Sequence, residues 1–118
     1  MSASLKILFI CSRNEWRSRT AEEIFRGTPG WSVKSAGTER SARVRLTAGL
    51  IGWADVLVAM ERKHVDRIRA GFADVLPGKR LICLRIPDDW EYMNPELIEL
   101  LRGRMAEHFG AATEDRAS

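Results

Sequence analysis

The sequence has few of the residues that build disulfide-rich or metal-dependent proteins. It holds two cysteines and two histidines in 118 residues, and neither set has the spacing of a metal site, so we expect a reducing compartment and no metal. We predict that His64 and His108, which lie far apart in sequence, are both at the surface. No apolar run is long enough to cross a membrane, and residues 1–11 lack the cleavage site of a signal peptide. We therefore expect a cytoplasmic protein without a membrane partner.

The charge is only mildly one-sided. A net charge of +3 favours anionic partners, but no nucleic-acid-binding module accompanies the arginines and the tryptophans are scattered, so we expect no nucleic-acid partner. The ordinary share of hydrophobic residues, 45%, supports a single domain with its own core. We place this domain at residues 1–110 and expect residues 111–118, which are small and polar, to form a disordered tail.

Apolar runs alternate with amphipathic stretches along the chain, which predicts an α/β fold with a parallel sheet and helices on both faces. The predicted strands are Leu5–Cys11, Trp31–Ser35, Asp55–Met60 and Arg80–Leu84. The predicted helices are Arg17–Arg26, Leu46–Ile51 with Thr47 as its cap, Glu61–Ala70, and one that Asn94 caps with Pro95 at its first position. We expect Gly27 to end the first helix in left-handed geometry, and Gly71 to end the third.

The most informative stretch is the junction of the first strand and the first helix. A buried strand ends at Cys11, a polar loop follows, and a helix begins near Arg17. Converging loop N–H groups and the helix dipole make an anion site. A helix N-terminus and a neighbouring arginine favour the thiolate form of cysteine, and Arg17 can bind two phosphate oxygens at once. These features predict covalent phosphoryl catalysis; a buried structural cysteine followed by a surface arginine is the alternative.

These residues also carry a resemblance to a known family. The segment Cys11-Ser-Arg-Asn14-Glu-Trp-Arg17-Ser18-Arg-Thr-Ala21-Glu22 resembles the signature of the low-molecular-weight protein tyrosine phosphatases, Cys-x-x-Asn-x-x-Arg-Ser-x-x-Ala-Glu. Two later segments, Ser35–Thr38 and Leu46–Met60, resemble the same family in the same order. The resemblance implies a four-stranded parallel sheet with strand order 2-1-3-4, and a hydrolase that needs no cofactor.

The resemblance also implies the substrate and the roles of the site residues. The substrate would be a phosphorylated protein or a small phosphate ester, either phosphotyrosine or another aryl or alkyl phosphate, and inorganic phosphate or sulfate can occupy the loop. Cys11 would attack phosphorus and the Ser18 hydroxyl would hold the thiolate. The predicted phosphate-binding residues are Ser12, Arg13, Asn14, Glu15, Trp16, Arg17 and Ser18.

A phosphatase also needs an acid that protonates the leaving group. The family uses an aspartate in the loop after the last strand, where this sequence has Asp88 and Asp89. We predict Asp88, because Trp90 then matches an aromatic residue that flanks the family's site, and we keep Asp89 as its rival. Two solvated turn aspartates are the alternative explanation.

Several residues depart from the family pattern. A histidine that supports the loop asparagine is missing, and Ser41 or Arg40 stands nearest to its position in a shortened 39–45 segment. Arg13 replaces a glycine, and no second cysteine lies near Trp16. Glu15 opposes a bound phosphate unless it points to solvent or pairs with Arg13 or Arg19.

These departures keep a second hypothesis open, which is a phosphate-binding or partner-binding module without turnover. Arsenate reduction, which relatives of this fold perform, is a weaker third hypothesis. That reaction needs resolving cysteines, and only Cys83 is available. We predict that Cys83 lies in the middle of a buried strand.

Overall fold

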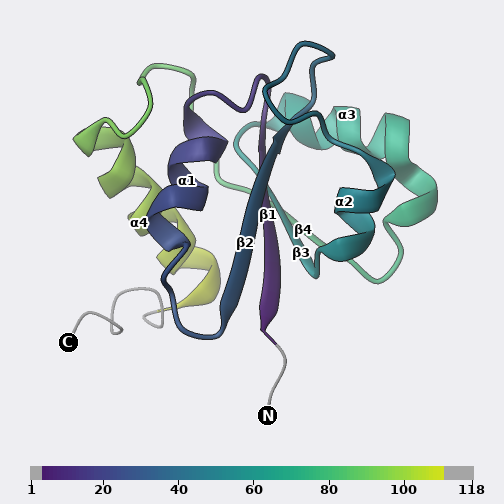
Figure 1. Cartoon of the computed structure of the whole chain (residues 1–118), viewed down its shortest axis with the longest axis horizontal. Coiled ribbons are helices and arrows are strands. Elements are labelled where there is room, and N and C mark those ends of the chain that lie inside the picture. The colour runs from purple at the N-terminus through teal and green to yellow at the C-terminus, as the bar shows by residue number, and fades with distance from the viewer. Residues whose placement is uncertain (1–3, 111–118) are drawn as a thin grey trace.

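The structure is a computed structural model that describes residues 4–110, so the predicted tail at residues 111–118 lies outside the described residues. Four strands form one parallel sheet in the order β2-β1-β3-β4, which confirms the predicted strand order (Figure 1). The strands are β1 (Leu5–Cys11), β2 (Trp31–Gly37), β3 (Val56–Ala59) and β4 (Arg80–Cys83). The order reverses beside β1, since β2 lies on one side of it and β3 on the other.

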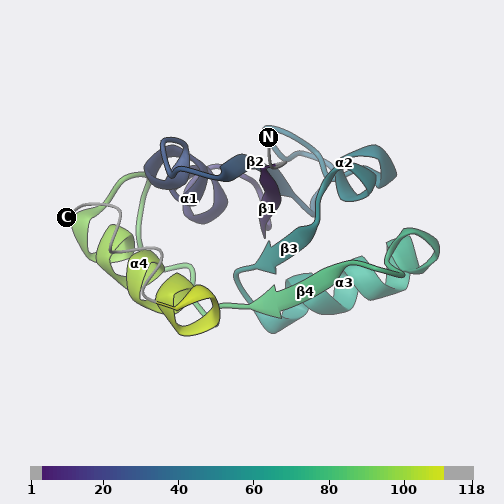
Figure 2. The same ribbon diagram turned by 90° about the horizontal axis from the view of Figure 1, so that it is seen from below.

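Helices cover both faces of the sheet. The elements are α1 (Arg17–Phe25), α2 (Ala48–Trp53), α3 (Arg62–Phe72), a short 3₁₀ turn (Ala73–Val75) and α4 (Pro95–Phe109). Helices α1 and α4 lie on one face, and α2 and α3 lie on the other (Figure 2). Within residues 4–110, no helix is both long and apolar enough to span a membrane.

The central strand β1 is buried on both faces, as its continuous apolar run predicted. Ile7 and Phe9 pack into the core under α1 and α4, whereas Leu8 and Ile10 pack into the core under α2 and α3. Successive side chains of a strand point to opposite faces, so one apolar run serves two cores. Burial on both faces fixes the place at which β1 ends, and therefore fixes the position of Cys11.

The two predictions about helix-ending glycines are wrong. Gly27 does not adopt a positive φ; Gly30 does, with φ of 82°, directly before β2. Gly71 lies inside α3, which continues to Phe72, because an exposed glycine near the end of a helix weakens it without stopping it. The two predicted caps are confirmed: the side chains of Thr47 and Asn94 accept hydrogen bonds from the first turns of α2 and α4.

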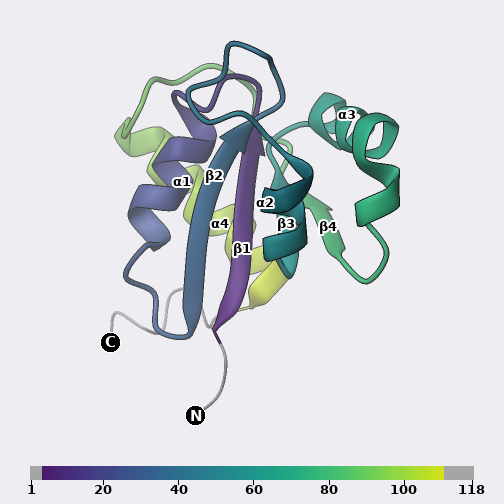
Figure 3. The ribbon, with the colours of Figure 1, turned by 45° about the vertical axis from the view of Figure 1, so that its right-hand side comes forward.

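The carboxyl ends of the strands meet at one edge of the sheet, where the loops after β1, β2 and β4 lie together (Figure 3). Strand β2 extends two residues beyond its predicted end, and Gly37 pairs with Cys11 in the register of β1 and β2. At Gly37 the chain passes very close to the loop after β1. A Cβ atom built there would lie 2.6 Å from the Ser12 carbonyl oxygen and 2.9 Å from the Arg13 carbonyl carbon.

We predict that Gly37→Ala lowers the free energy of unfolding by about 1–3 kcal/mol, because the new methyl group meets backbone atoms that cannot rotate away. Gly103→Ala is the matched control: nothing lies within 4 Å of its Cβ position in the middle of α4, so this variant should gain up to about 1 kcal/mol. Urea unfolding of both variants measures the difference. Equal stability of the two variants would contradict the close approach at Gly37.

Candidate active site

The carbonyl groups of the loop between β1 and α1 point away from its centre. Four consecutive carbonyl oxygens accept hydrogen bonds from the segment that follows β2, three from backbone N–H groups and one from a side chain. The bonds are Thr38 N to Cys11 O (2.9 Å), Glu39 N to Ser12 O (2.9 Å), Arg43 N to Arg13 O (2.9 Å) and Arg43 Nε to Asn14 O (3.1 Å). The short 39–45 segment therefore wraps the outside of the loop.

The peptide N–H groups of the same loop must consequently face inward, because the C=O and N–H of one planar peptide point in opposite directions. The Asn14 N–H follows this rule and donates to Cys11 Sγ at 3.2 Å. Asn14 has a positive φ of 59°, a conformation that asparagine adopts more readily than most residues. The loop thus presents several N–H donors around the Cys11 sulfur, as an anion site requires.

A buried hydrogen-bond chain supports the Cys11 side chain from below. Ser18 Oγ lies 3.0 Å from Cys11 Sγ and accepts a hydrogen bond from Asn14 Nδ2 at 2.8 Å. The serine hydroxyl proton then has two possible acceptors, Cys11 Sγ and the more distant carbonyl oxygen of Ala36 at 3.4 Å. A thiolate at Cys11 would be the stronger acceptor.

Arg17 is fully buried at the first turn of α1, with 2% of its surface exposed. Its Nη1 donates to the Glu61 carboxylate and to the Ile86 carbonyl oxygen, the latter at 2.9 Å. These two acceptors can use both protons of Nη1. Nε has no hydrogen-bond partner among the described residues although it is buried. The side of the guanidinium that carries Nε and Nη2 is the one suited to bind two oxygens of an oxyanion.

Glu61 is a site residue that the sequence analysis missed. It precedes α3 as the N-cap residue, and β3 is the neighbour of β1 in the sheet, so the ends of the two strands bring Glu61 to Arg17. Partial burial alone would raise the pKa of Glu61. The hydrogen bond and the charge of Arg17 outweigh that effect and hold the pKa of the carboxyl below its usual 4.5. Glu61 is therefore ionised at neutral pH and balances the buried guanidinium charge.

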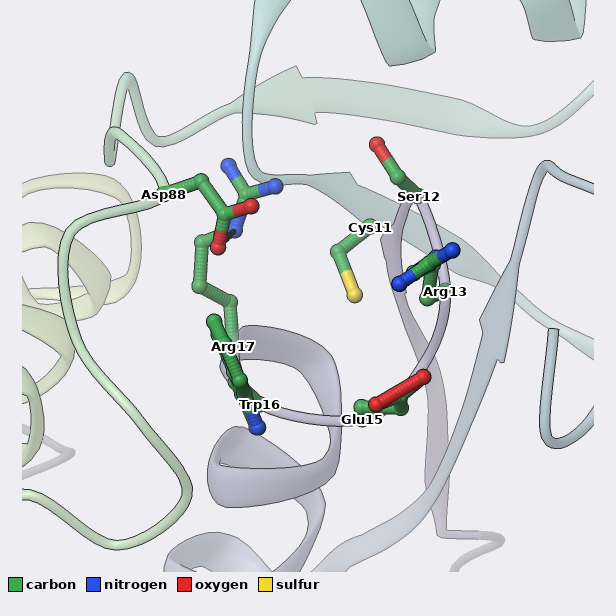
Figure 4. A pocket seen from close by; sticks show the side chains of 7 residues that line it. All are labelled: Cys11, Ser12, Arg13, Glu15, Trp16, Arg17 and Asp88. Atoms are coloured by element: carbon green, nitrogen blue, oxygen red, sulfur yellow. Dashed lines mark ion pairs between the residues drawn. The ribbon is translucent and has the colours of Figure 1, made fainter.

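A pocket opens above the Cys11 sulfur. Arg17 and Asp88 stand on one side of the Cys11 side chain and Arg13 on the other (Figure 4). The pocket is lined by Cys11, Ser12, Arg13, Glu15, Trp16, Arg17 and Asp88. Asp88 Oδ1 lies 3.6 Å from Arg17 Nε. Asp89 does not line the pocket, and neither do Asn14 and Ser18, which lie buried beneath it.

Glu15 has neither of the two partners that the sequence analysis considered. Arg13 forms an ion pair with Glu39 at 3.7 Å. Arg19 lies over the Tyr92 ring, 4.4 Å from its centroid. The Glu15 side chain is exposed at the pocket. Its carboxylate therefore faces solvent at the mouth of the site.

The prediction that His64 lies at the surface is wrong, since only 1% of it is exposed. His64 shares the inward face of α3 with Val65 and Ile68, and its hydrogen-bond partner Ser12 lies 52 residues away in sequence. Its Nδ1 accepts the Glu61 backbone N–H at 3.0 Å, and its Nε2 lies 2.8 Å from Ser12 Oγ. Burial first, and then the charge of Arg17, lower the pKa of His64 from 6.5 to about 4.

The prediction that Cys83 lies in the middle of a buried strand is also wrong. Cys83 is the last residue of β4, an edge strand, and is only half-buried. It stands opposite Ala59 of β3, which in turn stands opposite Ile10 of β1. Two strand spacings therefore separate Cys83 from the end of β1. Within residues 4–110, no three acidic, histidine or cysteine side chains gather as a possible metal site.

We predict that His64 makes the protein less stable as the pH falls from about 6.5 to about 4. The unfolded chain takes up a proton near pH 6.5 while the folded protein resists it to about pH 4, so stability is retained above this window and lost through it. The loss is roughly 3 kcal/mol at most. His64→Asn should remove this pH-dependent loss of stability. The measurement is the free energy of unfolding as a function of pH for the parent and for His64→Asn. Parallel curves would show that His64 is not held neutral.

No protein-family model matches the sequence, and no curated protein matches it significantly. Solved structures do match. SP-PTP, a low molecular weight protein tyrosine phosphatase from Streptococcus pyogenes, is 17% identical, with TM-score 0.71 over 88% of this chain and 90% of that one. The tyrosine phosphatase Wzb from Escherichia coli K30, in complex with phosphate, is 20% identical, with TM-score 0.72 over 91% and 96%.

Two further likenesses widen the range of activities found on this architecture. The YwlE arginine phosphatase from Geobacillus stearothermophilus is 23% identical, with TM-score 0.67 over 89% of this chain and 92% of that one. A thioredoxin-dependent arsenate reductase from Corynebacterium glutamicum is 23% identical, with TM-score 0.61 over 94% of this chain but only 63% of that one. The chain therefore has the fold of the low-molecular-weight protein tyrosine phosphatases, as its sequence motifs predicted.

Proposed function

We propose that this protein is a cysteine-dependent phosphatase that hydrolyses phosphate monoesters, with phosphotyrosine or another aryl phosphate as the substrate. One observation carries the proposal: inward-facing loop N–H groups and a buried arginine, whose Nε makes no hydrogen bond, lie at the pocket that holds Cys11. Such donors match the oxygens of a phosphoryl group and the charge that develops on them in the transition state. The tyrosine phosphatase of the same fold that holds phosphate supports the same ligand chemistry.

The reaction would proceed in two steps. Cys11 Sγ attacks phosphorus, so that an S–P bond forms and the P–O bond to the leaving group breaks, while Asp88 gives its proton to the leaving oxygen. Water then attacks phosphorus and transfers a proton to Asp88, and the S–P bond breaks to release phosphate and the thiolate. Ser18, at 3.0 Å, would stabilise that thiolate.

Arg17 would grip the phosphoryl group in both steps. Its Nη1 is already held by Glu61 and the Ile86 carbonyl, so the guanidinium is oriented before the substrate arrives. A phosphoryl oxygen would accept the hydrogen bond that Nε lacks and would replace its ion pair with Asp88, which measures 3.6 Å in the free protein. Asp88 would then be free to turn toward the leaving group, which is where a general acid must act.

The rim of the pocket favours a flat substrate. Trp16 is one of the pocket-lining residues, and 38% of its surface is exposed. An aryl ring entering above Cys11 can pack against the indole, which adds apolar and aromatic contact. This contact supports an aryl phosphate over a small alkyl phosphate.

Glu15 favours a second candidate substrate, phosphoarginine. A carboxylate at the mouth repels a phosphate dianion but attracts a guanidinium, which becomes the cationic leaving group when the P–N bond breaks and nitrogen takes a proton. The arginine phosphatase of the same fold supports this possibility. Rates on phosphoarginine and phosphotyrosine peptides separate the two candidates. Glu15→Gln should lower the rate for phosphoarginine alone if that is the substrate.

Two other hypotheses have less support. A phosphate-binding module without turnover needs no general acid, yet Asp88 lies at the pocket beside Arg17. For arsenate reduction, Cys83 would have to reach Cys11, yet two strand spacings amount to roughly 9–10 Å. The Cα atoms of a disulfide lie within about 7 Å, and the two free cysteines of the described residues are therefore too far apart without backbone movement.

We predict that Cys11→Ser lowers kcat for 4-nitrophenyl phosphate by at least about 10³-fold, because the serine hydroxyl stays protonated at neutral pH. The affinity for inorganic phosphate, measured by calorimetry, should change by less than about threefold, since the loop and Arg17 are intact. Turnover close to that of the parent would remove Cys11 from the mechanism.

We predict that Asp88→Asn lowers kcat by about 10²-fold or more for phosphotyrosine, whose leaving group needs a proton. The loss should be less than about tenfold for 2,4-dinitrophenyl phosphate, whose leaving group is a stable anion. Asp89→Asn is the matched control and should leave both rates near those of the parent. A leaving-group-dependent loss in Asp89→Asn alone would assign the acid to Asp89, and small equal losses in both variants would leave neither aspartate in that role.

A further inference from the structure

His64 is a buried titratable side chain that the reaction above does not use, yet it makes hydrogen bonds to two parts of the site. Its ring lies on the first turn of α3 and contacts the loop after β1 through Ser12 and the start of α3 through Glu61. These segments are 52 and 3 residues away from it in sequence. Nothing in a capping role for α3 requires the contact with Ser12.

The hydrogen bonds fix the tautomer of the ring. The Glu61 backbone N–H can only donate, so Nδ1 of His64 must be the acceptor and carries no proton. In the neutral ring the proton therefore lies on Nε2, and Nε2 donates to Ser12 Oγ at 2.8 Å. Neutral imidazole with this assignment satisfies both contacts, whereas imidazolium would face the Glu61 N–H with a second N–H.

The direction of the His64–Ser12 bond determines what Ser12 can do. Because its oxygen accepts from His64, its hydroxyl proton is left to donate elsewhere. Within residues 4–110, no other hydrogen bond of the Ser12 hydroxyl is present. Ser12 also lines the pocket above Cys11. The hydroxyl proton is therefore uncommitted in the free protein and can be given to an anion that reaches it.

The second contact of His64 acts on Arg17. The Glu61 backbone is held by Nδ1, and the Glu61 carboxylate holds Arg17 Nη1. One imidazole therefore connects the loop side of the pocket to its arginine side. The two segments meet because Ser12 follows β1 and Glu61 follows the adjacent strand β3.

We propose that His64 is a positioning residue of the phosphoryl site: through Nε2–H it sets Ser12 as a hydrogen-bond donor to the bound phosphoryl group, and through Nδ1 it holds Glu61 against Arg17. The inference rests on the proposed phosphatase function and adds His64 as a residue that positions its binding groups. The charged groups that face the ring are Arg17, Glu61, Lys63 and Arg67. Three of these four are cations, which disfavours imidazolium and keeps the ring neutral, while the Glu61 N–H fixes its tautomer.

The test is a double-mutant cycle of Ser12→Ala and His64→Asn. The asparagine Oδ1 can still accept the Glu61 N–H, but its amide is too short to reach Ser12. Each single variant should raise the Kd for inorganic phosphate and lower kcat/KM for phosphotyrosine by about three- to tenfold, the worth of one hydrogen bond. In the double variant, the phosphate Kd and kcat/KM should be no more impaired than in the more impaired of the two single variants, because both changes remove the same interaction.

Ser35→Ala is the matched control, because it also removes a half-buried serine hydrogen bond, to Glu22, away from the pocket. It should keep the phosphate Kd and kcat/KM of the parent even where it loses stability. ¹⁵N NMR at pH 7 reports the tautomer of the ring. In the parent, His64 should be the Nε2–H tautomer, and in Ser12→Ala its Nε2 resonance should shift.

The outcomes distinguish a failure of the role of His64 from a failure of the proposed phosphatase function. Additive losses in the cycle, variants that lose only stability, or an Nδ1–H tautomer would each overturn the role of His64. If the parent binds inorganic phosphate but turns over no phosphate ester, the proposed function fails while the binding and NMR measurements still decide the role of His64. If the parent neither binds nor hydrolyses any phosphate compound, both proposals fail together.

Discussion

The site depends on the orientation of four peptide groups in the loop after β1. Their carbonyl oxygens are all bonded outward, to the segment that follows β2, and planarity of the peptide bond then turns the N–H groups inward. Gly37 allows β2 to approach the loop closely enough for this arrangement. Arg43 supplies two of the four bonds, so the shortened 39–45 segment acts as an outer brace for the loop.

The inward N–H groups create a positive potential inside the loop, and the buried Arg17 adds its charge to it. A buried guanidinium needs partners, and Arg17 finds them in Glu61 and the Ile86 carbonyl on one nitrogen alone. The arginine is thereby held in place while its other edge remains available to a ligand. Removing one partner of such a buried pair is typically far more damaging than the pair is stabilising. The same contact thus links stability to ligand binding.

The sequence predicted what is local and missed what is long-range. The continuous apolar run of β1, the caps at Thr47 and Asn94, and the spacing of Cys11 and Arg17 are readable because each depends on neighbours in sequence. The strand order followed from the family resemblance. Glu61, His64 and Arg43 were missed because their partners lie 44, 52 and 29 residues away, and no periodicity reports such contacts. For the same reason, the hydrogen bond from Arg43 to the Asn14 carbonyl oxygen was not predictable.

The most direct measurement of the central claim is rapid acid quenching during turnover of a substrate with a radiolabelled phosphoryl group, followed by peptide mapping. The account predicts a transient label on the peptide that contains Cys11, formed before phosphate is released and absent when the loop is saturated with inorganic phosphate. Turnover with no label on that peptide at any quench time, or with label on another residue, would contradict it.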